Sequence, residues 1–308
     1  MQTILITGGT GLVGRALSEF MTQRGYKVII LSRAESKSSQ NNNITYAKWD
    51  INNNYIDIDA IKKADCIIHL AGAGVMDKKW TTDYKKEIID SRTISSRLLI
   101  QALRQCQHNV KAVISSSAIG YYGKDEKPGY FFDEDDEADN SFLGNTCKLW
   151  EASIEPVKEL KIRLVKFRIG IVLSKQGGAL AEFIKPLKLR IAAILGNGQQ
   201  MVSWIHINDL CRLFLFAIEN QNMQGVFNAV APTPVSNKYL TLSLAKIIAP
   251  TFYIPIYVPA FLLKLILGSK SIEVLKSTTV SCQKLINTGF TFLHSTIGEA
   301  LITFYKSE

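Results

Sequence analysis

The sequence predicts an α/β protein with a doubly wound parallel sheet and a smaller C-terminal α+β domain. Three observations predict this fold class. The apolar run Met1–Ile6 leads through a glycine-rich turn into an amphipathic helix at Arg15–Met21. Strand-like and helix-like segments then alternate through the first half of the chain, as they do in parallel sheets covered by helices. After Gly170 the segments become shorter and are interrupted by glycines and prolines.

Each element follows from its local pattern. Short apolar runs bounded by loop residues predict further buried strands at Lys27–Leu31, Ile44–Trp49, Cys66–Ala71, Val110–Ser115 and Ile162–Phe167. Apolar residues at helical spacing predict further helices at Ile58–Ala64, Lys79–Gln105 and Lys148–Leu160. Pro156 predicts a kink or an early end in the last helix, because proline removes a backbone donor.

The change to shorter segments, interrupted by glycines and prolines, also suggests a domain boundary. A chain of 308 residues is long enough for two domains. We place the dinucleotide-binding-type domain at residues 1–165 and a substrate-side domain at residues 166–308. The segment 226–230 has the pattern of a buried strand and can return to the first sheet.

The composition is that of an ordinary globular protein, with 47% hydrophobic and 20% charged residues. The formal net charge of +9 suits an anionic ligand such as a phosphorylated cofactor, and it equally suits a merely basic surface. The basic residues are scattered rather than gathered in a block or an aromatic-interleaved stripe. We therefore expect no nucleic-acid partner.

Cysteine spacing and the chain ends bear on the compartment. The five cysteines form no Cys-x-x-Cys pair, which predicts neither a metal site nor a disulfide framework and fits reduced thiols in a cytoplasmic protein. The N-terminus has the pattern of a strand from its first residues, so we expect no signal peptide. Pro255, Pro259 and Lys264 break the apolar stretch 254–268, so we expect it not to span a membrane.

The turn after the first strand carries glycine at positions 8, 11 and 14. In a dinucleotide-binding turn one glycine makes the tight bend, one admits the pyrophosphate, and one lets the helix pack closely on the strand. Backbone amides at the helix N-terminus then hold the anion. We therefore expect a Rossmann-type cofactor site that includes Gly8, Thr10, Gly11, Leu12, Val13 and Gly14.

Residues at the ends of the next strands predict which dinucleotide binds. A residue that reads the ribose 2′-hydroxyl would be Asp or Glu after the second strand, but this chain has Ser32 and Arg33 there. A guanidinium pairs with phosphate through two N–H groups, so Arg33 favours NADP over NAD. Asp50, after the third strand, is a candidate to accept a hydrogen bond from the adenine amino group, and a turn aspartate is the alternative.

Small and polar residues follow the later strands. Leu70, Ala71 and Gly72 leave room for a ligand to lie against the backbone at the carboxyl end of a strand. The serine run that begins at Ser115 follows the next strand, and we include Ser115 among the cofactor-binding candidates. We interpret His69, on the buried strand itself, as a core histidine.

The glycine turn and the run Ser115–Gly123 resemble the extended short-chain dehydrogenase/reductases of the NAD(P)-dependent epimerase/dehydratase family. The resemblance implies that Ser117 hydrogen-bonds the reacting oxygen and that Arg168 lies near the nicotinamide end. In that family the tyrosine of a Tyr-x-x-x-Lys motif transfers the proton, and the lysine lowers its pKa and holds the nicotinamide ribose. Lys148 fits the lysine, but Gly144 stands at the tyrosine position.

Tyr121 and Tyr122 follow the serine run and are the candidates to replace the missing phenol. The predicted catalytic residues are therefore Ser117, Tyr121, Tyr122 and Lys148. Candidate substrate contacts lie before, on and well beyond the long helix: Trp80, Lys86, Arg92, Trp204 and His206. Arg92 would pair with a substrate phosphate or carboxylate, with a local ion pair as the alternative. For His206 a structural role is the favoured alternative.

Further segments resemble an atypical, epimerase-like subfamily with an extra C-terminal domain: Ala71–Trp80, Asp90–Arg92, Cys147–Glu151, Ser203–Leu210 and Ala231–Asn237. This resemblance covers nearly the whole chain and implies cofactor binding more firmly than a reaction. It leaves open an NADP-dependent, epimerase-like oxidoreductase with a small, anionic substrate, or a non-catalytic NADP(H)-binding protein with a regulatory or cell-division role. The superfamily commonly forms homodimers through helices that correspond to 83–105 and 146–160.

Overall fold

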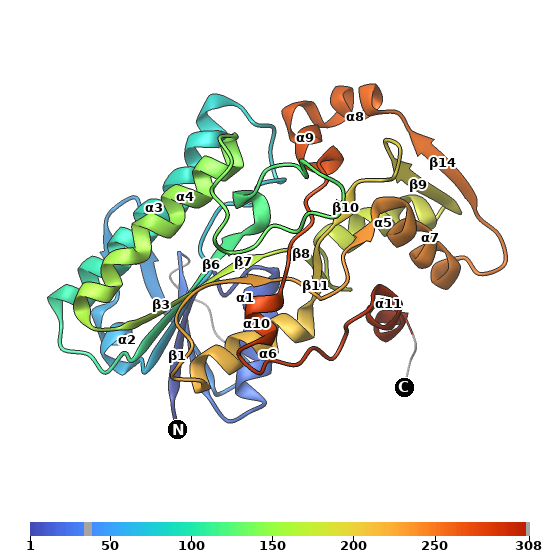
Figure 1. The fold of residues 1–308 in the computed structure, drawn as a ribbon. Coiled ribbons are helices and arrows are strands. Elements are labelled where there is room, and N and C mark those ends of the chain that lie inside the picture. Colours follow the sequence, from blue (N-terminus) through green and yellow to red (C-terminus); the bar gives the residue numbers. More distant parts are fainter. Residues whose placement is uncertain (34–38, 306–308) are drawn as a thin grey trace.

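One sheet of eight strands organises the fold (Figure 1), in a computed structural model that describes residues 1–33 and 39–305. The strand order is β12-β7-β6-β5-β1-β2-β3-β4. Neighbouring strands are parallel throughout, except that the short β4 runs antiparallel to β3. The predicted fold class, a doubly wound parallel α/β sheet, is confirmed.

The strands of this sheet bury apolar side chains on both faces. Their bounds are β1 Thr3–Thr7, β2 Lys27–Ser32, β3 Ile44–Asp50, β4 Tyr55–Ile56, β5 Cys66–His69, β6 Ala112–Ala118, β7 Arg163–Ile169 and β12 Gly225–Ala229. In β1, Ile4 and Ile6 belong to one hydrophobic core, and Leu5 belongs to the core on the other face. Strands covered on both faces therefore have continuous apolar sequences.

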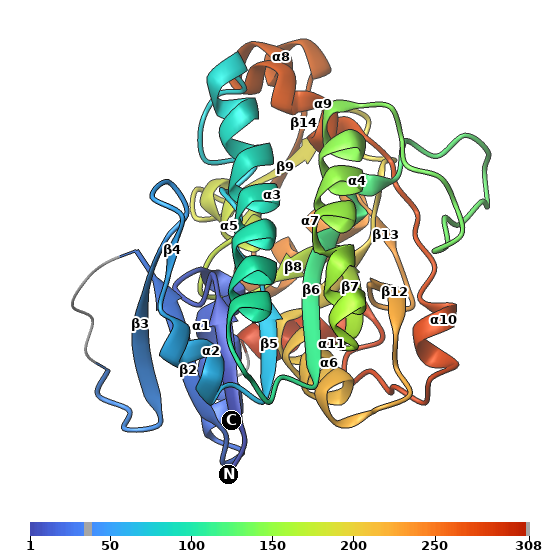
Figure 2. The same cartoon turned by 90° about the vertical axis from the view of Figure 1, so that its left-hand side faces the viewer.

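Helices cover the two faces of the sheet (Figure 2). On one face lie α1 (Leu12–Thr22) and α6 (Ile207–Glu219), whose buried residues join the larger core. On the other face lie α2 (Ile58–Lys63), α3 (Thr82–Gln105) and α4 (Phe142–Ile154), which contribute to the second core. The long helices α3 and α4 run side by side, so the residues between them are shielded from water.

The strand order reverses at β1, which has β2 on one side and β5 on the other. In open α/β sheets ligands bind in the crevice at this reversal, beyond the carboxyl ends of the strands. The strands that end there are β1 at Thr7, β2 at Ser32 and β5 at His69. The fold thus brings the glycine turn, Arg33 and the segment after His69 to the same edge of the sheet.

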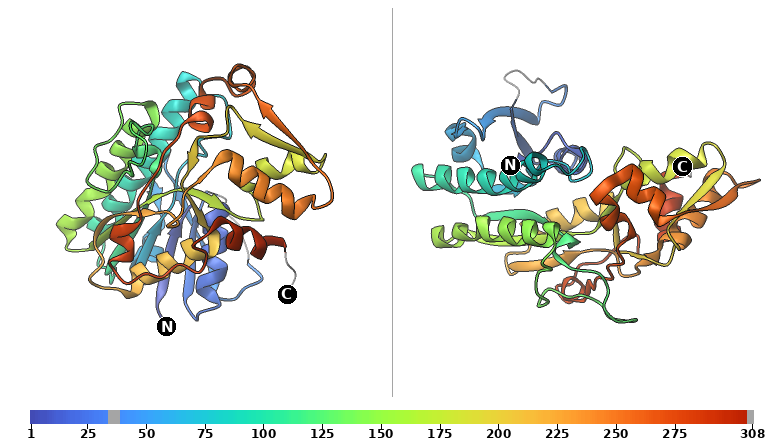
Figure 3. Two further views of the ribbon diagram at one scale, coloured as in Figure 1. Left: turned by 45° about the vertical axis from the view of Figure 1, so that its right-hand side comes forward. Right: turned by 90° about the horizontal axis from the view of Figure 1, so that it is seen from above.

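The rest of the chain builds a smaller α+β part beside the sheet (Figure 3). Its elements are β8 Ile171–Leu173, α5 Ala179–Leu187, β9 Ile191–Leu195, β10 Met201–Val202, β11 Trp204–His206, β13 Val235–Ser236, α7 Asn237–Ile248, β14 Ile254–Val258, α8 Ala260–Leu267, α9 Ser271–Leu275, α10 Gln283–Ile286 and α11 Ile297–Tyr305. Strands β8 and β11 pair, as do β9 and β14, and β10 and β13. Between these pieces the chain returns to the large sheet as β12, which pairs parallel with β7.

Several elements differ from the predicted bounds in ways that matter for the site. Strand β6 runs to Ala118, so the serine run lies inside a strand: β7 pairs with all three serines, and β5 pairs as far as Ser115. Helix α4 begins at Phe142 rather than Lys148, because Ser141 caps it by accepting a hydrogen bond from the Gly144 amide. The helix changes to a 3-10 turn after Ile154, just before Pro156, as the proline predicts.

Two further expectations concern the apolar stretch 254–268 and the cysteines. Within residues 1–33 and 39–305, no helix is both long enough and apolar enough to cross a membrane, and the apolar stretch 254–268 forms β14 and α8. All five cysteines are free thiols.

Candidate functional site

The glycine turn is packed so closely that a side chain cannot be added at two of its positions. Gly8 has a φ of +68°, and a Cβ there would lie 2.9 Å from the Leu70 carbonyl. A Cβ at Gly14 would lie 2.4 Å from the Gly8 carbonyl oxygen, which also accepts from the Gly11 amide at 3.0 Å. Thr10 and Gly11 remain exposed just before α1, where backbone amides attract an anion.

A buried polar pair fixes the strand ends beside the turn. Thr7 Oγ1 lies 2.8 Å from His69 Nδ1 and accepts from the amides of Leu70 and Ala71 at 3.1 Å each. His69 Nε2 lies 3.1 Å from Ser96 Oγ. Burial lowers the pKa of His69 to about 4, so its imidazole is neutral at neutral pH. His69 is a core histidine that holds the end of β5 against the turn.

The two predicted residues beyond the turn have different surroundings. Arg33 is exposed at the carboxyl end of β2, directly after the buried Ser32. Asp50 closes a turn, because its carboxylate accepts from the amides of Asn52 and Asn53 and from the Asn53 side chain. The hydrogen bond from that side chain lowers the pKa of Asp50. The structure therefore gives Asp50 the turn role and leaves Arg33 open to a ligand.

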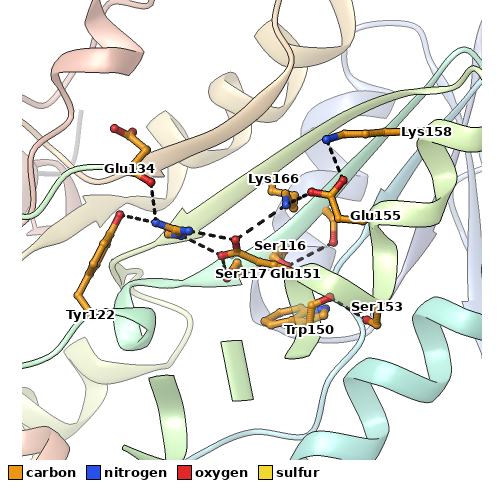
Figure 4. Close-up of polar contacts among 12 residues, drawn as sticks. Ser116, Ser117, Tyr122, Glu134, Trp150, Glu151, Ser153, Glu155, Lys158 and Lys166 are labelled. Atoms are coloured by element: carbon orange, nitrogen blue, oxygen red, sulfur yellow. Dashed lines mark hydrogen bonds and ion pairs between the residues drawn. The ribbon is translucent and has the colours of Figure 1, made fainter. Parts of the chain in front are cut away.

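A buried charge network lies behind the strand ends and joins β6, β7, β12 and α4 (Figure 4). Arg168 holds Glu151 through two contacts, 2.9 Å from Nε and 3.1 Å from Nη2. Ser117 donates to the same carboxylate at 2.7 Å. Tyr122 accepts from Arg168 Nη1 at 2.9 Å and donates to Asn228 at 2.8 Å. All five side chains are buried, so they contact one another rather than open solvent.

This network limits what its members can do. Ser117 donates its only hydroxyl proton to Glu151, so its oxygen is left to accept a hydrogen bond. Burial raises the pKa of Tyr122, whose hydroxyl is already committed to Asn228, and the charge of Arg168 is matched by Glu151. Tyr121 is only half-buried, with its ring 3.4 Å from the Arg168 guanidinium. Of the two tyrosines, Tyr121 is therefore the better placed to meet a ligand.

The face of α4 that is turned toward β6 does not carry Lys148. Lys148 is exposed, whereas Cys147 and Glu151 are buried. A Cβ at Gly120, in the loop after β6, would lie 3.4 Å from Leu143 and 3.9 Å from Cys147. The structure thus brings Leu143 and Cys147 to this loop, and it does not bring Lys148 to the network. The ribose role of Lys148 stays a prediction, and the structure places this lysine on the exposed side of α4, outside the network.

Two predicted substrate residues are buried in the C-terminal part. The Trp204 indole N–H donates to the Thr233 carbonyl at 2.9 Å. His206 Nε2 lies 3.1 Å from Thr303 Oγ1, and its ring stacks on His294 with centroids 3.8 Å apart. Burial lowers the pKa of His206 to about 4. These contacts argue against a substrate role for Trp204 and His206, and they give His206 the structural role that was its alternative.

The other three predicted substrate residues lie before or on α3. Lys86 is exposed and forms an ion pair with Asp90 one turn away, which indicates a solvated helix face. Trp80 is half-buried, and its indole N–H donates to a backbone carbonyl at 2.8 Å. Arg92 is buried, with its guanidinium packed against Gly72. Of these three, Arg92 is the residue that packs against Gly72, close to the end of β5.

Glu151 is the central residue that the sequence analysis left without a role. It lies on the buried side of α4 with Cys147, Trp150 and Ile154. A carboxylate among buried residues normally has a charged or hydrogen-bonding partner. The helical spacing of Glu151 from Cys147 and Ile154 could therefore have predicted a buried, paired carboxylate. No sequence pattern indicated a role for Asn228, because its contact with Tyr122 depends on the pairing of β12 with β7.

A glycine turn at the reversal point of a doubly wound sheet defines a dinucleotide-binding α/β protein. The family model described as the NAD dependent epimerase/dehydratase family matches residues 4–229. A second model, described as a domain of unknown function, matches residues 258–303. The chain therefore belongs to the NAD-dependent epimerase/dehydratase family, and the predicted family and extra C-terminal domain are confirmed.

Several known proteins are similar over almost their whole length. The epimerase family protein YfhF of Bacillus subtilis (strain 168) is 32% identical over 301 residues, 97% of each chain. The structure of human epimerase family protein SDR39U1 (isoform 2) with NADPH has a TM-score of 0.84 at 25% identity and covers 99% of both chains. UDP-glucuronic acid 4-epimerase from Bacillus cereus, in complex with UDP-glucuronic acid and NAD, has a TM-score of 0.79 over 99% of this chain and 98% of that one. At 18% identity, this last likeness shows the fold alone.

Proposed function

We propose that this chain is an NADP(H)-dependent oxidoreductase that acts on a small, anionic substrate. The proposal rests on the glycine turn packed against Leu70, with the exposed Arg33 at the end of the neighbouring strand. The turn offers amides to a pyrophosphate, and Arg33 offers a planar cation to a 2′-phosphate. NADPH in the similar human structure supports this choice of cofactor. When bound, the nicotinamide would accept or supply a hydride.

In this proposal proton transfer uses Ser117 rather than a tyrosine of α4. Because Ser117 donates to Glu151, a substrate hydroxyl would donate to the Ser117 oxygen. As the substrate O–H bond breaks, its proton would pass to Ser117 Oγ, and the serine proton would pass to Glu151. Residues 166–308 would then supply the substrate side of the crevice.

Arg33→Ala is expected to lower the affinity for NADPH by about 10–100-fold and to leave the affinity for NADH unchanged. A charge-assisted hydrogen bond contributes about 1.5–3 kcal/mol, which corresponds to this range. Fluorescence titration of both nucleotides measures the effect. The control is Arg24→Ala, which removes an exposed arginine just after the C-terminal end of α1, away from the glycine turn. Tighter binding of NADH by the unmodified protein would contradict the proposed preference.

A screen of small anionic hydroxy and keto compounds, followed by NADPH absorbance, is expected to reveal turnover. Ser117→Ala should reduce the rate by about 10²–10⁴-fold, the range of a lost proton-transfer group, with NADPH affinity unchanged. Ser116→Ala, on the opposite face of the strand, removes a hydroxyl outside the network and is the matched control. Equal rates in the two variants would exclude proton transfer through Ser117.

One observation favours a second function. Helix α4 presents Leu143 and Cys147 to the loop after β6, and neither side chain can replace a tyrosine and lysine pair. A chain with this face would bind NADP(H) without turning over a substrate, and would act as a regulatory or cell-division-associated protein. The same screen decides between the two functions, because the binding protein would titrate with NADPH and show no turnover with any compound.

A further inference from the structure

Arg92 of α3 is a buried cation, and no acid pairs with it among the residues that the structure describes. The residue as a whole is 9% exposed. Across residues 1–33 and 39–305, its hydrogen bonding is limited to Nη1 donating to the Ile88 carbonyl at 2.8 Å, and no carboxylate pairs with it. An unpaired charge away from water is costly, so a buried guanidinium normally has an anion beside it. Most of the donors of Arg92 are therefore left for a partner outside the chain.

The guanidinium lies directly against the segment that follows β5. A Cβ at Gly72 would lie 2.9 Å from Arg92 Cζ and 3.2 Å from Nε, while Gly72 itself is exposed. On its other side Arg92 lies over the Trp150 ring, 4.9 Å from the centroid. The guanidinium is thus held between the end of β5 and α4, next to the place where the proposed cofactor would lie.

Trp150 adds a second donor without an acceptor. Its Nε1–H is buried and has no hydrogen-bond partner in the part of the chain that the structure describes. Cys147 lies near the same cation, and burial raises its pKa to about 11, so its thiol is a neutral, weak donor. Leaving a buried donor unsatisfied costs about 1–3 kcal/mol. The Arg92 guanidinium and the Trp150 indole N–H donate and cannot accept, so together they point to a missing ligand that only accepts.

We propose that Arg92 and Trp150 bind a carboxylate group of the substrate. The inference rests on the proposed function, because it assigns the anionic group of that substrate. A carboxylate is planar, accepts through two oxygens, and carries one charge, which matches one guanidinium edge and one indole N–H. A phosphate dianion would bring both of its charges to this one guanidinium, whereas each carboxylate of a dicarboxylate brings one. The nearby Lys276 is already paired with Glu273 at 2.9 Å.

Calorimetric titration of the NADPH-bound protein with malonate, and separately with inorganic phosphate, tests the proposal. The unmodified protein should bind malonate more tightly than phosphate. Arg92→Met should weaken malonate binding by at least about tenfold, and Trp150→Phe, which keeps the ring and removes the N–H, by about two- to tenfold. Arg97→Met removes an exposed arginine further along α3, with the same change of charge, and should leave both affinities unchanged.

Thermal unfolding without malonate separates a binding role from a packing role. If Arg92 is an uncompensated charge, Arg92→Met should unfold at the same temperature as the unmodified protein or higher. A lower Tm together with unchanged malonate affinity would overturn the proposal, as would equal binding of phosphate and malonate. Absence of NADPH binding would refute the proposed function, whereas NADPH binding without malonate binding would refute this inference alone. If Arg92→Met fails to fold, Trp150→Phe provides the test.

Discussion

Glu151→Gln is expected to lower the free energy of unfolding by about 3–5 kcal/mol, the cost of leaving a buried charge without its partner. Glu151 accepts two hydrogen bonds from Arg168 and a third from Ser117. Glutamine has one oxygen and no charge, so the guanidinium of Arg168, whose side chain is 4% exposed, would stay buried and unpaired. Denaturant unfolding followed by tryptophan fluorescence measures the loss.

A carboxylate in the 3-10 turn that follows α4 provides the matched control for this prediction. Glu159 pairs with Arg104 at the surface, where both side chains are at least half exposed. Glu159→Gln should therefore change the stability by no more than about 1 kcal/mol. Adding Arg168→Met to Glu151→Gln should recover part of the loss, because the unpaired charge is removed. Equal losses in Glu151→Gln and Glu159→Gln would show that the network does not stabilise the fold.

Gly14→Ala is expected to abolish measurable NADPH binding and to destabilise the protein by about 1–3 kcal/mol, the usual cost of overpacking. The added Cβ would lie 2.4 Å from the Gly8 carbonyl oxygen and 2.5 Å from the Gly9 Cα. Both are backbone atoms, so relief requires the turn to move and its amides to leave their common orientation. NADPH titration and thermal unfolding of the same sample measure the two effects.

A glycine without such neighbours separates the local clash from a general effect of alanine. Gly298 lies in α11, and a Cβ there would meet nothing within 4 Å. Gly298→Ala should leave NADPH binding unchanged and stabilise the helix by up to about 1 kcal/mol, because alanine is the better helix former. NADPH binding that survives Gly14→Ala would mean that the turn is not the anion site.

The large sheet and its turn were predictable because their signals are local. Ile4, Leu5 and Ile6 form an apolar run because both faces of β1 are buried. The glycines recur where β1, α1 and β5 pack too closely for a side chain. The site was harder to predict, because it depends on helix phase and on contacts that are distant in the chain. Helix α4 packs its apolar side, with Cys147 and Ile154, against the sheet, which buries Glu151 and leaves Lys148 exposed.

The network and the buried aromatic residues show the same limit. Ser117 and Tyr122 were identified as separate candidates, but their common partners come from α4, β7 and β12. Trp204 lies on a three-residue strand, too short for a period-two pattern to show that the side chain is fully buried. In both cases tertiary packing decides the role, and no short stretch of sequence contains that information.

Because the chain returns to the large sheet as β12, the position of a recombination point decides whether the sheet stays complete. A recombination point at residue 165 would fall within β7 and would separate Arg168 from most of its network. It would also remove β12 and expose an unpaired strand edge. The first family model extends to residue 229, where β12 ends, and the second begins at residue 258. Shuffling after residue 229 would keep the complete sheet as one inherited module and leave the last part of the chain free to diverge.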